Sequence, residues 1–519
     1  MRDVRTRRGF LIALGAGAAG LALSACGGAA VTVSTTAASA ASSTAAQSPA
    51  GATTTTQAAP TIASTTAPAT SAASSTIATT SSAASSAAAS AAPKPTATPQ
   101  VLSAGKKAAT NITWYINSND QDPKVIEQKF LPAFQQLHPD ISVEATIGPG
   151  GIIDAIEKYI TLTAGGTSPD LFLVTRAAAD LARQGIFTDI SPLLAQDKFD
   201  TSKYPQAPYT YESTLGGKVY GIPLSMQAES MALAYNRDLF RKAAVPEPPT
   251  TWGDPNWTWE TFVEAARKLT VVSGNNTALT QTGVGSMAYN VHLPVLWAGN
   301  WVSPRLDQAT CDSEAMVQTY TSFFDLSKQY KVMPGFYGLT GPSGTKGFLG
   351  GTVGMTTVGG WEFATYRDAK VNWGFAPWPK ATRSTYAYNP EEGNIAKTSR
   401  HVDATWTFLK WMDNASLYAN TFGFMPVVVA DAVKWAKDYY SGQPDARPQV
   451  LTDALATAQP TDPIFLLPGA DAFVRATIEP ALSKQIPGGA DVRTTLQSIK
   501  GPLQQLVNQC ACSGTAPAY

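Results

Sequence analysis

The feature that most constrains the fold of this chain is a long stretch near its N-terminal end that is almost without charge. Between Arg8 and Lys106 the only charged residue is Lys94. Most other residues in this stretch are Ala, Ser and Thr, with scattered Pro. A segment of this composition cannot bury enough apolar surface to offset the entropy lost when a chain becomes ordered. We therefore expect residues 27–110 to form a disordered linker in front of a folded part.

The residues before this linker have the pattern of an export signal. Residues 1–26 combine an arginine-rich head, an apolar run over 10–23 and small residues before Cys26, which is typical of a signal peptide. The apolar run is shorter than the ~20 residues that cross a bilayer as a helix. Residues 6–11 resemble a twin-arginine export signal, and residues 23–26 resemble a bacterial lipobox. This resemblance implies that Cys26 is lipidated and holds the protein at the outer face of the bacterial cytoplasmic membrane.

Residues 111–519 alternate segments that have the spacing of strands and of helices. The strand-like segments are 112–116, 141–145 and 170–174, and the helix-like segments are 125–137, 152–164 and 177–184. Units of strand, helix and strand of this length predict an α/β fold around a mostly parallel sheet. Such sheets bind ligands at the carboxyl ends of their strands. Asn119, Asp120, Thr175 and Arg176 follow two of these strands and are therefore candidate ligand-binding residues.

Composition and motifs argue against several classes of function. The 38 basic and 38 acidic residues cancel, so the chain has no overall field that would attract nucleic acid. With three His and four Cys in the chain, a metal site is not expected. The motifs of serine hydrolases, zinc peptidases and P-loop proteins do not occur in the sequence. Glycosidases need two carboxylates about 5–10 Å apart on either side of a bond, which the adjacent residues Glu391 and Glu392 do not provide. We therefore expect this pair to lie in a solvated loop.

The sequence leaves the pairing of the cysteines after Cys26 open. Cys510 and Cys512 are separated by one residue and would close only a cramped ring. Free thiols and a single bridge to Cys311 are both compatible with the sequence.

Tryptophan is frequent, with 12 in the chain, and two motifs contain it beside Gly or Asn. These motifs are Trp297-Ala298-Gly299-Asn300-Trp301 and Gly359-Gly360-Trp361-Glu362. An indole between glycines has little local cover and can stack on the apolar face of a sugar ring. Packing in the core is the alternative for each of these indoles. Asn300, Trp301, Trp361 and Glu362 therefore join the candidate ligand-binding residues.

Several short motifs, taken in their order along the chain, resemble the family 1 extracellular solute-binding proteins, which are the sugar receptors of ABC importers. The motifs are Gly221-Ile222-Pro223, residues 229–240, residues 257–260, residues 299–301, Gly360-Trp361, residues 373–379, residues 408–411 and residues 423–427. The resemblance implies a two-lobed periplasmic-binding-protein fold of type II, whose lobes close over a ligand about hinge crossings. It implies a lobe 1 of about 111–224 and 378–412, a lobe 2 of about 229–371 and 413–519, and crossings near 223–229, 371–378 and 411–426.

The same resemblance implies ligand contacts at individual positions. Glu229 stands where the maltose-binding member of the family has a carboxylate in the cleft. Trp361 and Tyr289 match two of its stacking aromatic residues. Val174 stands where that member has another tryptophan. The resemblance therefore implies that the aromatic residues lining the ligand cleft differ here.

Together these observations predict a lipid-anchored binding protein that captures a carbohydrate and passes it to an ABC permease. The protein is expected to be a monomer that uses no cofactor and catalyses no reaction. The first alternative is a secreted carbohydrate-active enzyme that uses Glu229 with a second carboxylate. The second alternative is a sensor subunit of the same fold that acts with a membrane kinase.

Overall fold

The computed structural model describes residues 100–510 and Cys512, except for 117–120, 149–151, 176–177, 229, 275–276, 286 and 288–289. The predicted signal peptide, the lipidation site Cys26 and the linker up to residue 99 lie outside these described residues. Within the described residues, no helix combines the length and the apolar character needed to cross a membrane.

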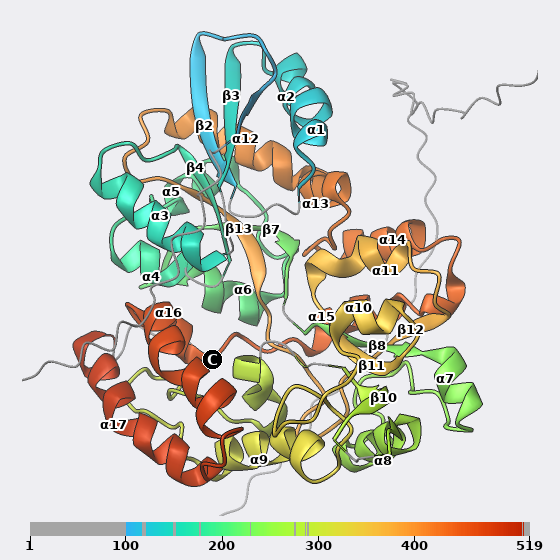
Figure 1. Ribbon diagram of the computed structural model, residues 1–519. Helices are drawn as coiled ribbons and strands as arrows, with labels where there is room; N and C mark the ends of the chain where they lie inside the picture. The colour runs from blue at the N-terminus through green and yellow to red at the C-terminus, as the bar shows by residue number, and fades with distance from the viewer. Residues whose placement is uncertain are drawn as a thin grey trace, which may run out of the picture. The chain divides into compact units, whose positions relative to one another are not determined.

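A mixed sheet of six strands, the first sheet, organises one half of the fold (Figure 1). Its order is β1-β3-β2-β4-β13-β7, with the strands at Gln100–Ser103, Ile141–Ile147, Thr110–Ile116, Leu171–Thr175, Pro390–Ile395 and Ile222–Met226. Strand β2 is parallel to β3 and β4, whereas β13 is antiparallel to both β4 and β7. Strands β4 and β7 therefore run in the same direction. The predicted α/β class is confirmed, but the first sheet is mixed and not mostly parallel, because β1 and β13 pair antiparallel with their neighbours.

Strand β1 lies in a segment that we expected to belong to the disordered linker, so that limit of the linker was wrong. The strand pairs antiparallel with residues 144–147 of β3, and Leu102 is 1% exposed. The average composition of the linker concealed the short apolar pair Val101-Leu102, which completes the edge of the sheet. The folded part of the chain therefore includes residues from Gln100 onward.

Alternation along β2 sends neighbouring aromatic side chains to opposite faces of the first sheet. On one face, the ring of Trp114 lies 5.9 Å from that of Phe130 and 5.5 Å from that of Phe408 in α12 (Val402–Asp413). On the other face, the ring of Tyr115 lies 5.4 Å from that of Tyr159 in α3 (Ile152–Ala164). Each face of the sheet thus has its own core, and α3 has the limits that the spacing predicted.

The other helices of this half also follow local sequence signals. Residues 123–137 form one continuous helical segment made of α1 (Pro123–Val125), η1 (Ile126–Phe130) and α2 (Leu131–Leu137). Helix α4 (Ala178–Arg183) ends as predicted at Gly185, whose φ is 73°. The Gly185 and Ile186 N–H groups donate to the carbonyls of Ala182 and Leu181 at 3.0 Å, which closes the last turn of the helix.

A second sheet of five strands organises the other half of the fold. Its order is β12-β8-β11-β10-β9, with the strands at Trp373–Ala376, Ala232–Asn236, Val353–Val358, Leu279–Val284 and Val271–Val272. Helix α8 (Trp259–Leu269) begins at Thr258, whose hydroxyl accepts from the Thr261 N–H, while the Thr261 hydroxyl accepts from the Thr258 N–H. This capping box pairs two backbone N–H groups at the start of the helix. The helix buries Phe262 and Leu269 completely.

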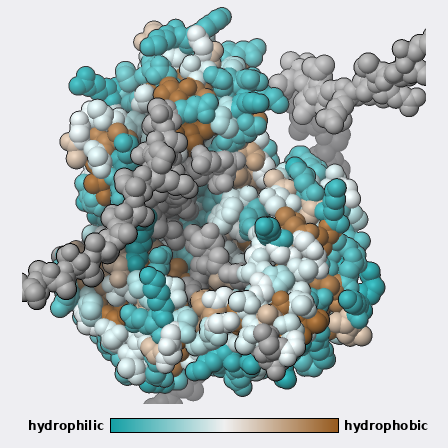
Figure 2. All heavy atoms as spheres, viewed as in Figure 1, coloured by the Kyte–Doolittle hydropathy of each residue, from teal (hydrophilic) through white to brown (hydrophobic). Residues whose placement is uncertain are grey.

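The remaining elements cover the two sheets. They are α5 (Ser191–Asp197), α6 (Gln206–Ser213), β5 (Thr214–Leu215), β6 (Lys218–Val219), α7 (Arg237–Lys242), η2 (Asn290–Trp297), α9 (Glu314–Lys328), α10 (Gly344–Leu349), η3 (Gly360–Glu362), α11 (Phe363–Arg367), η4 (Asn414–Ser416), α13 (Leu417–Phe422), α14 (Val429–Tyr439), η5 (Pro444–Ala446), α15 (Gln449–Thr457), η6 (Pro463–Leu466), α16 (Ala470–Phe473), η7 (Val474–Ile478), η8 (Ala481–Gln485) and α17 (Val492–Cys510). On the face seen in Figure 2, apolar residues appear at the described surface only in scattered patches.

Connections between the two sheets meet at the fully buried residue Met226, at the end of β7. From there the chain continues to β8, and the segment that returns from β12 reaches the first sheet at Pro390, which pairs with Met226. Between α13 and α14, the Met425 carbonyl accepts the Met226 N–H at 2.8 Å. We call Met226, Pro390 and Met425 the Met226 junction. The lobe limits and crossing limits that the resemblance implies stay predictions.

Candidate functional site

The carboxyl ends of the strands in the first sheet lie at one edge. Strands β2, β3, β4 and β7 end at Ile116, Ile147, Thr175 and Met226. Because β13 runs in the opposite direction, its first residues lie at the same edge, where Glu391 is the register partner of Thr175. The side chain of Thr175 is 3% exposed. Of the polar residues predicted to follow the strands, Thr175 is therefore at the expected edge.

A buried hydrogen-bond network lies at this edge and centres on Glu391. Its carboxylate accepts from the Tyr418 hydroxyl at 2.8 Å and from the Ser225 hydroxyl at 3.1 Å. The Tyr418 hydroxyl in turn accepts from Nε2 of Gln121 at 2.6 Å. Gln121 directly follows residues 117–120, which include the predicted contacts Asn119 and Asp120. The network thus joins β13, β7 and α13 to Gln121.

The expectation that Glu391 and Glu392 lie in a solvated loop was wrong. Both are in β13, and each is 2% exposed. The Glu392 carboxylate accepts from the Ser213 hydroxyl, and burial raises its pKa to about 7. Local sequence concealed the strand because β13 is short, carries two charges and pairs only with strands far away in the chain.

The Trp361 motif follows β11 of the second sheet and contacts the Met226 junction. The Gly360 N–H donates to the Ala228 carbonyl at 3.2 Å. A Cβ atom at Gly360 would collide with the Met226 carbonyl oxygen and lie 2.9 Å from Cα of Gln227. Glycine is therefore required for this approach of the two segments. Trp361, next in the chain, is half-buried.

Two other residues of the tryptophan motifs have internal partners. The Glu362 carboxylate accepts from the Gly359 N–H at 2.9 Å and from the Thr345 hydroxyl, so it caps its own turn. Trp301 is 0% exposed, and its indole N–H donates to the Val291 carbonyl at 3.2 Å. Of the two interpretations that the sequence left open for Trp301, core packing describes this structure. Asn300 is half-buried.

Five predicted ligand contacts cannot be located, because Asn119, Asp120, Arg176, Glu229 and Tyr289 lie outside the described residues. Their roles stay predictions. A groove of about 450 Å³ elsewhere, lined by Val245, Pro249, Trp257 and Glu264 among others, contains none of the predicted residues. Within the described residues, no group of three or more His, Cys, Asp or Glu side chains is arranged to hold a metal ion.

A known protein family matches a large part of this chain. The sequence profile of the bacterial extracellular solute-binding proteins matches residues 117–416, which is more than half of the chain. The chain belongs to this family. Since the family is extracellular, membership implies that this solute-binding protein is exported, and the resemblance seen in the motifs is confirmed.

Relatives and solved structures agree with this membership. A binding protein of Brucella abortus (strain 2308) is 26% identical over 330 residues, which are 60% of this chain and 74% of the relative. The maltotriose-binding protein of Pyrococcus abyssi is 22% identical over 313 residues, which are 58% of this chain and 63% of the relative.

Two solved structures match this chain over nearly the whole of their own length. The Listeria monocytogenes ABC substrate-binding protein in complex with cycloalternan has a TM-score of 0.64 at 21% identity and covers 77% of this chain and 99% of its own. UgpB of Mycobacterium tuberculosis in complex with glycerophosphocholine has a TM-score of 0.63 at 18% identity. This match covers 78% of this chain and 99% of UgpB. The likeness confirms the two-lobed fold of this solute-binding protein.

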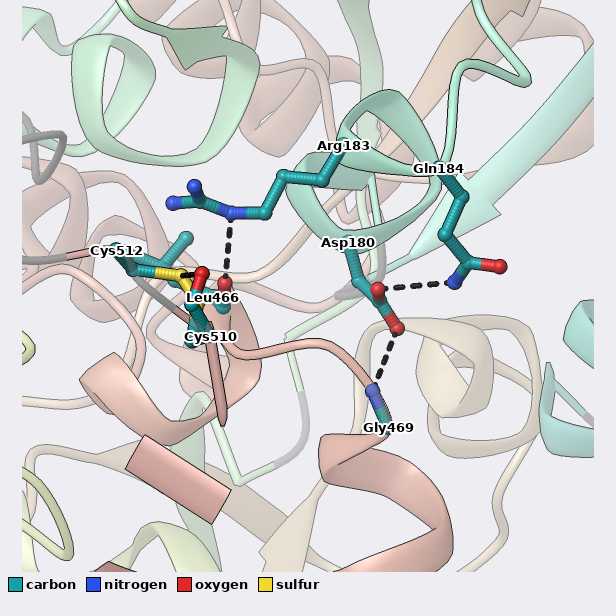
Figure 3. Close-up of a disulfide and its surroundings, with 7 residues drawn as sticks. All are labelled: Asp180, Arg183, Gln184, Leu466, Gly469, Cys510 and Cys512. Atoms are coloured by element: carbon teal, nitrogen blue, oxygen red, sulfur yellow. Dashed lines mark hydrogen bonds between the residues drawn. A yellow bond between two sulfur atoms is a disulfide. The ribbon is translucent and has the colours of Figure 1, made fainter. Parts of the chain in front are cut away.

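In a two-lobed solute-binding protein, contacts between the two halves matter for closure, and one group of them involves α4. The Asp180 carboxylate accepts from the Gly469 N–H at 3.2 Å, and Nε of Arg183 donates to the Leu466 carbonyl at 3.2 Å (Figure 3). Helix α4 packs in the core of the first sheet. Leu466 and Gly469 follow Asp462, whose carboxylate accepts from the Trp301 N–H in the other half. Sequence patterns gave no signal for these contacts.

The cysteine pairing that the sequence left open is assigned by the structure. Cys510 and Cys512 form a disulfide at the end of α17 (Figure 3). Cys311 is buried and forms no disulfide with a described cysteine.

Proposed function

We propose that this solute-binding protein captures a carbohydrate between its two lobes and delivers it to an ABC permease. The observation that carries this proposal is the contact of the Trp361 segment with the Met226 junction, beside the polar carboxyl edge of the first sheet. A sugar has an apolar ring face and a rim of hydroxyl groups. An indole next to buried polar groups suits both of these surfaces.

The proposed ligand contacts combine this edge with predicted residues. They are Asn119, Asp120, Thr175, Arg176, Glu229, Tyr289, Asn300 and Trp361. Trp301 and Glu362 are not part of this set, because Trp301 is fully buried and the Glu362 carboxylate accepts hydrogen bonds from Gly359 and Thr345.

Two relatives support a carbohydrate as the ligand. The Listeria neighbour was solved with cycloalternan, and the Pyrococcus relative is a maltotriose-binding protein. The Mycobacterium neighbour binds glycerophosphocholine, so a polar compound with a glycerol unit belongs in any test.

We further propose that lipidated Cys26 anchors the protein to the membrane and that residues 27–99 act as the tether. Two acyl chains contribute about 0.8 kcal/mol per buried CH₂ group, which is enough for stable attachment. Cys26→Ser should release the protein into the soluble fraction of fractionated cells. A variant that remains with the membrane would contradict the anchor.

Ligand capture is tested with maltotriose, cycloalternan, glycerophosphocholine and a set of common mono- and oligosaccharides. At least one carbohydrate should raise the melting temperature of the protein, bind with one-to-one stoichiometry in calorimetry and be recovered chemically unchanged. Chemical turnover of the bound compound would overturn the proposal in favour of an enzyme. Binding by the purified protein, together with unchanged uptake of the compound in cells that lack only this gene, would favour a sensor subunit instead.

A further inference from the structure

Asn389 is a buried amide that has no hydrogen-bond partner in the described part of the chain. The residue is 1% exposed, and neither Nδ2 nor Oδ1 takes part in a hydrogen bond there. Nearly all buried polar groups in folded proteins are paired, because an unpaired buried amide lowers stability. Groups that break this rule are expected at functional or strained sites, so the place of the residue in the fold decides its meaning.

The position of Asn389 in the fold indicates which function this is. It precedes Pro390, the register partner of Met226, and lies two residues before Glu391, the partner of Thr175. Asn389 therefore lies at the carboxyl edge of the first sheet, where α/β proteins bind ligands. The segment that carries Trp361 contacts the same junction from the second half, because Gly360 packs directly on Met226.

We propose that Asn389 is a ligand-binding residue whose amide pairs with hydroxyl groups of a carbohydrate held at the Met226 junction. This inference rests on the proposed function and narrows its ligand class. The amide has two N–H donors and one carbonyl acceptor, whereas each hydroxyl both donates and accepts. Two neighbouring free hydroxyl groups of a sugar can therefore satisfy both ends of the amide. Because the lobes hinge at this junction, their opening is expected to uncover Asn389.

The test replaces the amide with an apolar side chain of similar size, in Asn389→Leu. The apo protein should melt no lower than the wild type, because no hydrogen bond within the described fold is lost and the volume of the side chain is kept. Its affinity for whichever compound of the panel stabilises the wild type most should fall at least about tenfold in calorimetry. Asn389→Ala removes the amide without adding bulk and should lose affinity to the same extent.

Asn394 provides a matched control on the same strand. It is 0% exposed, but its amide donates to the Tyr220 carbonyl at 3.0 Å. Asn394→Leu should therefore lower the apo melting temperature and leave affinity within about twofold of the wild type.

The possible results distinguish this inference from the proposed function. A lower apo melting temperature for Asn389→Leu would mean that the amide has a structural partner, such as a buried water, and would overturn the inference. Wild-type affinity in both Asn389 variants would overturn it as well. If no compound stabilises the wild type, the proposed function fails, and the ligand role of Asn389 fails with it whatever the apo variants show.

Discussion

At the residue scale, two adjacent glutamates in β13 have different surroundings. Glu391 accepts from Tyr418 and Ser225 within the network at the carboxyl edge. The Glu392 carboxyl group accepts a hydrogen bond from the Ser213 hydroxyl, and burial raises the pKa of Glu392 to about 7. A raised pKa means that folding favours the neutral form of the Glu392 carboxyl group. Its contribution to stability is therefore full below its ordinary pKa and is lost as the pH rises through about 7.

Glu392→Gln should remove this part of the pH dependence, because the amide keeps the shape of the side chain and stays neutral. We expect little change at pH 5 and a variant more stable than the wild type at pH 8 by up to about 3 kcal/mol. Urea unfolding at the two pH values measures the difference. Glu264→Gln, at an exposed residue, is the control and should show no such gain. A variant that is equally destabilised at both pH values would contradict the argument.

A second prediction at the residue scale concerns Trp361. Because its indole is half-buried and its neighbours are glycines, Trp361→Ala should barely move the apo melting temperature. Loss of a stacking surface should reduce ligand affinity about thirtyfold, which is about 2 kcal/mol. Trp301→Ala is the contrasting variant, since removal of a fully buried indole should cost about 3–5 kcal/mol of stability. A sharp fall in melting temperature with normal binding for Trp361→Ala would exclude the stacking role.

At the scale of elements, α4 is linked to the segment before α16. Figure 1 shows α4 and α16 on one side of the structure and α13 and α14 on the other. The contacts of Asp180 and Arg183 thus lie away from the α13–α14 connection. We propose that contacts at this position form when the halves approach each other, so they should favour the closed state.

Asp180→Ala should therefore weaken ligand binding about fivefold to tenfold, because the Gly469 N–H loses its acceptor. Calorimetry measures this change with the compound that stabilises the wild type. Gln184→Ala is the control, since among the described residues the Gln184 amide donates only to Asp180, four positions earlier in the chain, and it should remain within about twofold. Equal affinity in wild type and Asp180→Ala would mean that these contacts do not contribute to closure.

At the scale of the whole molecule, we expect the two halves to move as nearly rigid bodies about the connections that meet at Met226. Each half has its own sheet, and the junction between them is formed by backbone pairing. Small-angle scattering of the protein without its linker should show a smaller radius of gyration when ligand is added to saturation. An unchanged radius at saturation would indicate a static binding module.

Local sequence patterns were sufficient to predict the alternation of strands and helices, the limits of α3, the end of α4 at Gly185 and the family. These features depend on spacing between near neighbours, on glycine φ angles and on motifs read in order. The tertiary structure alone decided that β1 extends the first sheet, that Glu391 and Glu392 are buried and that Trp301 is a core residue. It also decided that Gly360 and Pro390 meet the chain at Met226. These outcomes depend on contacts between segments that are far apart in the chain, such as Gln100 with Ile147 and Glu391 with Thr175, and local composition carries no information about such partners.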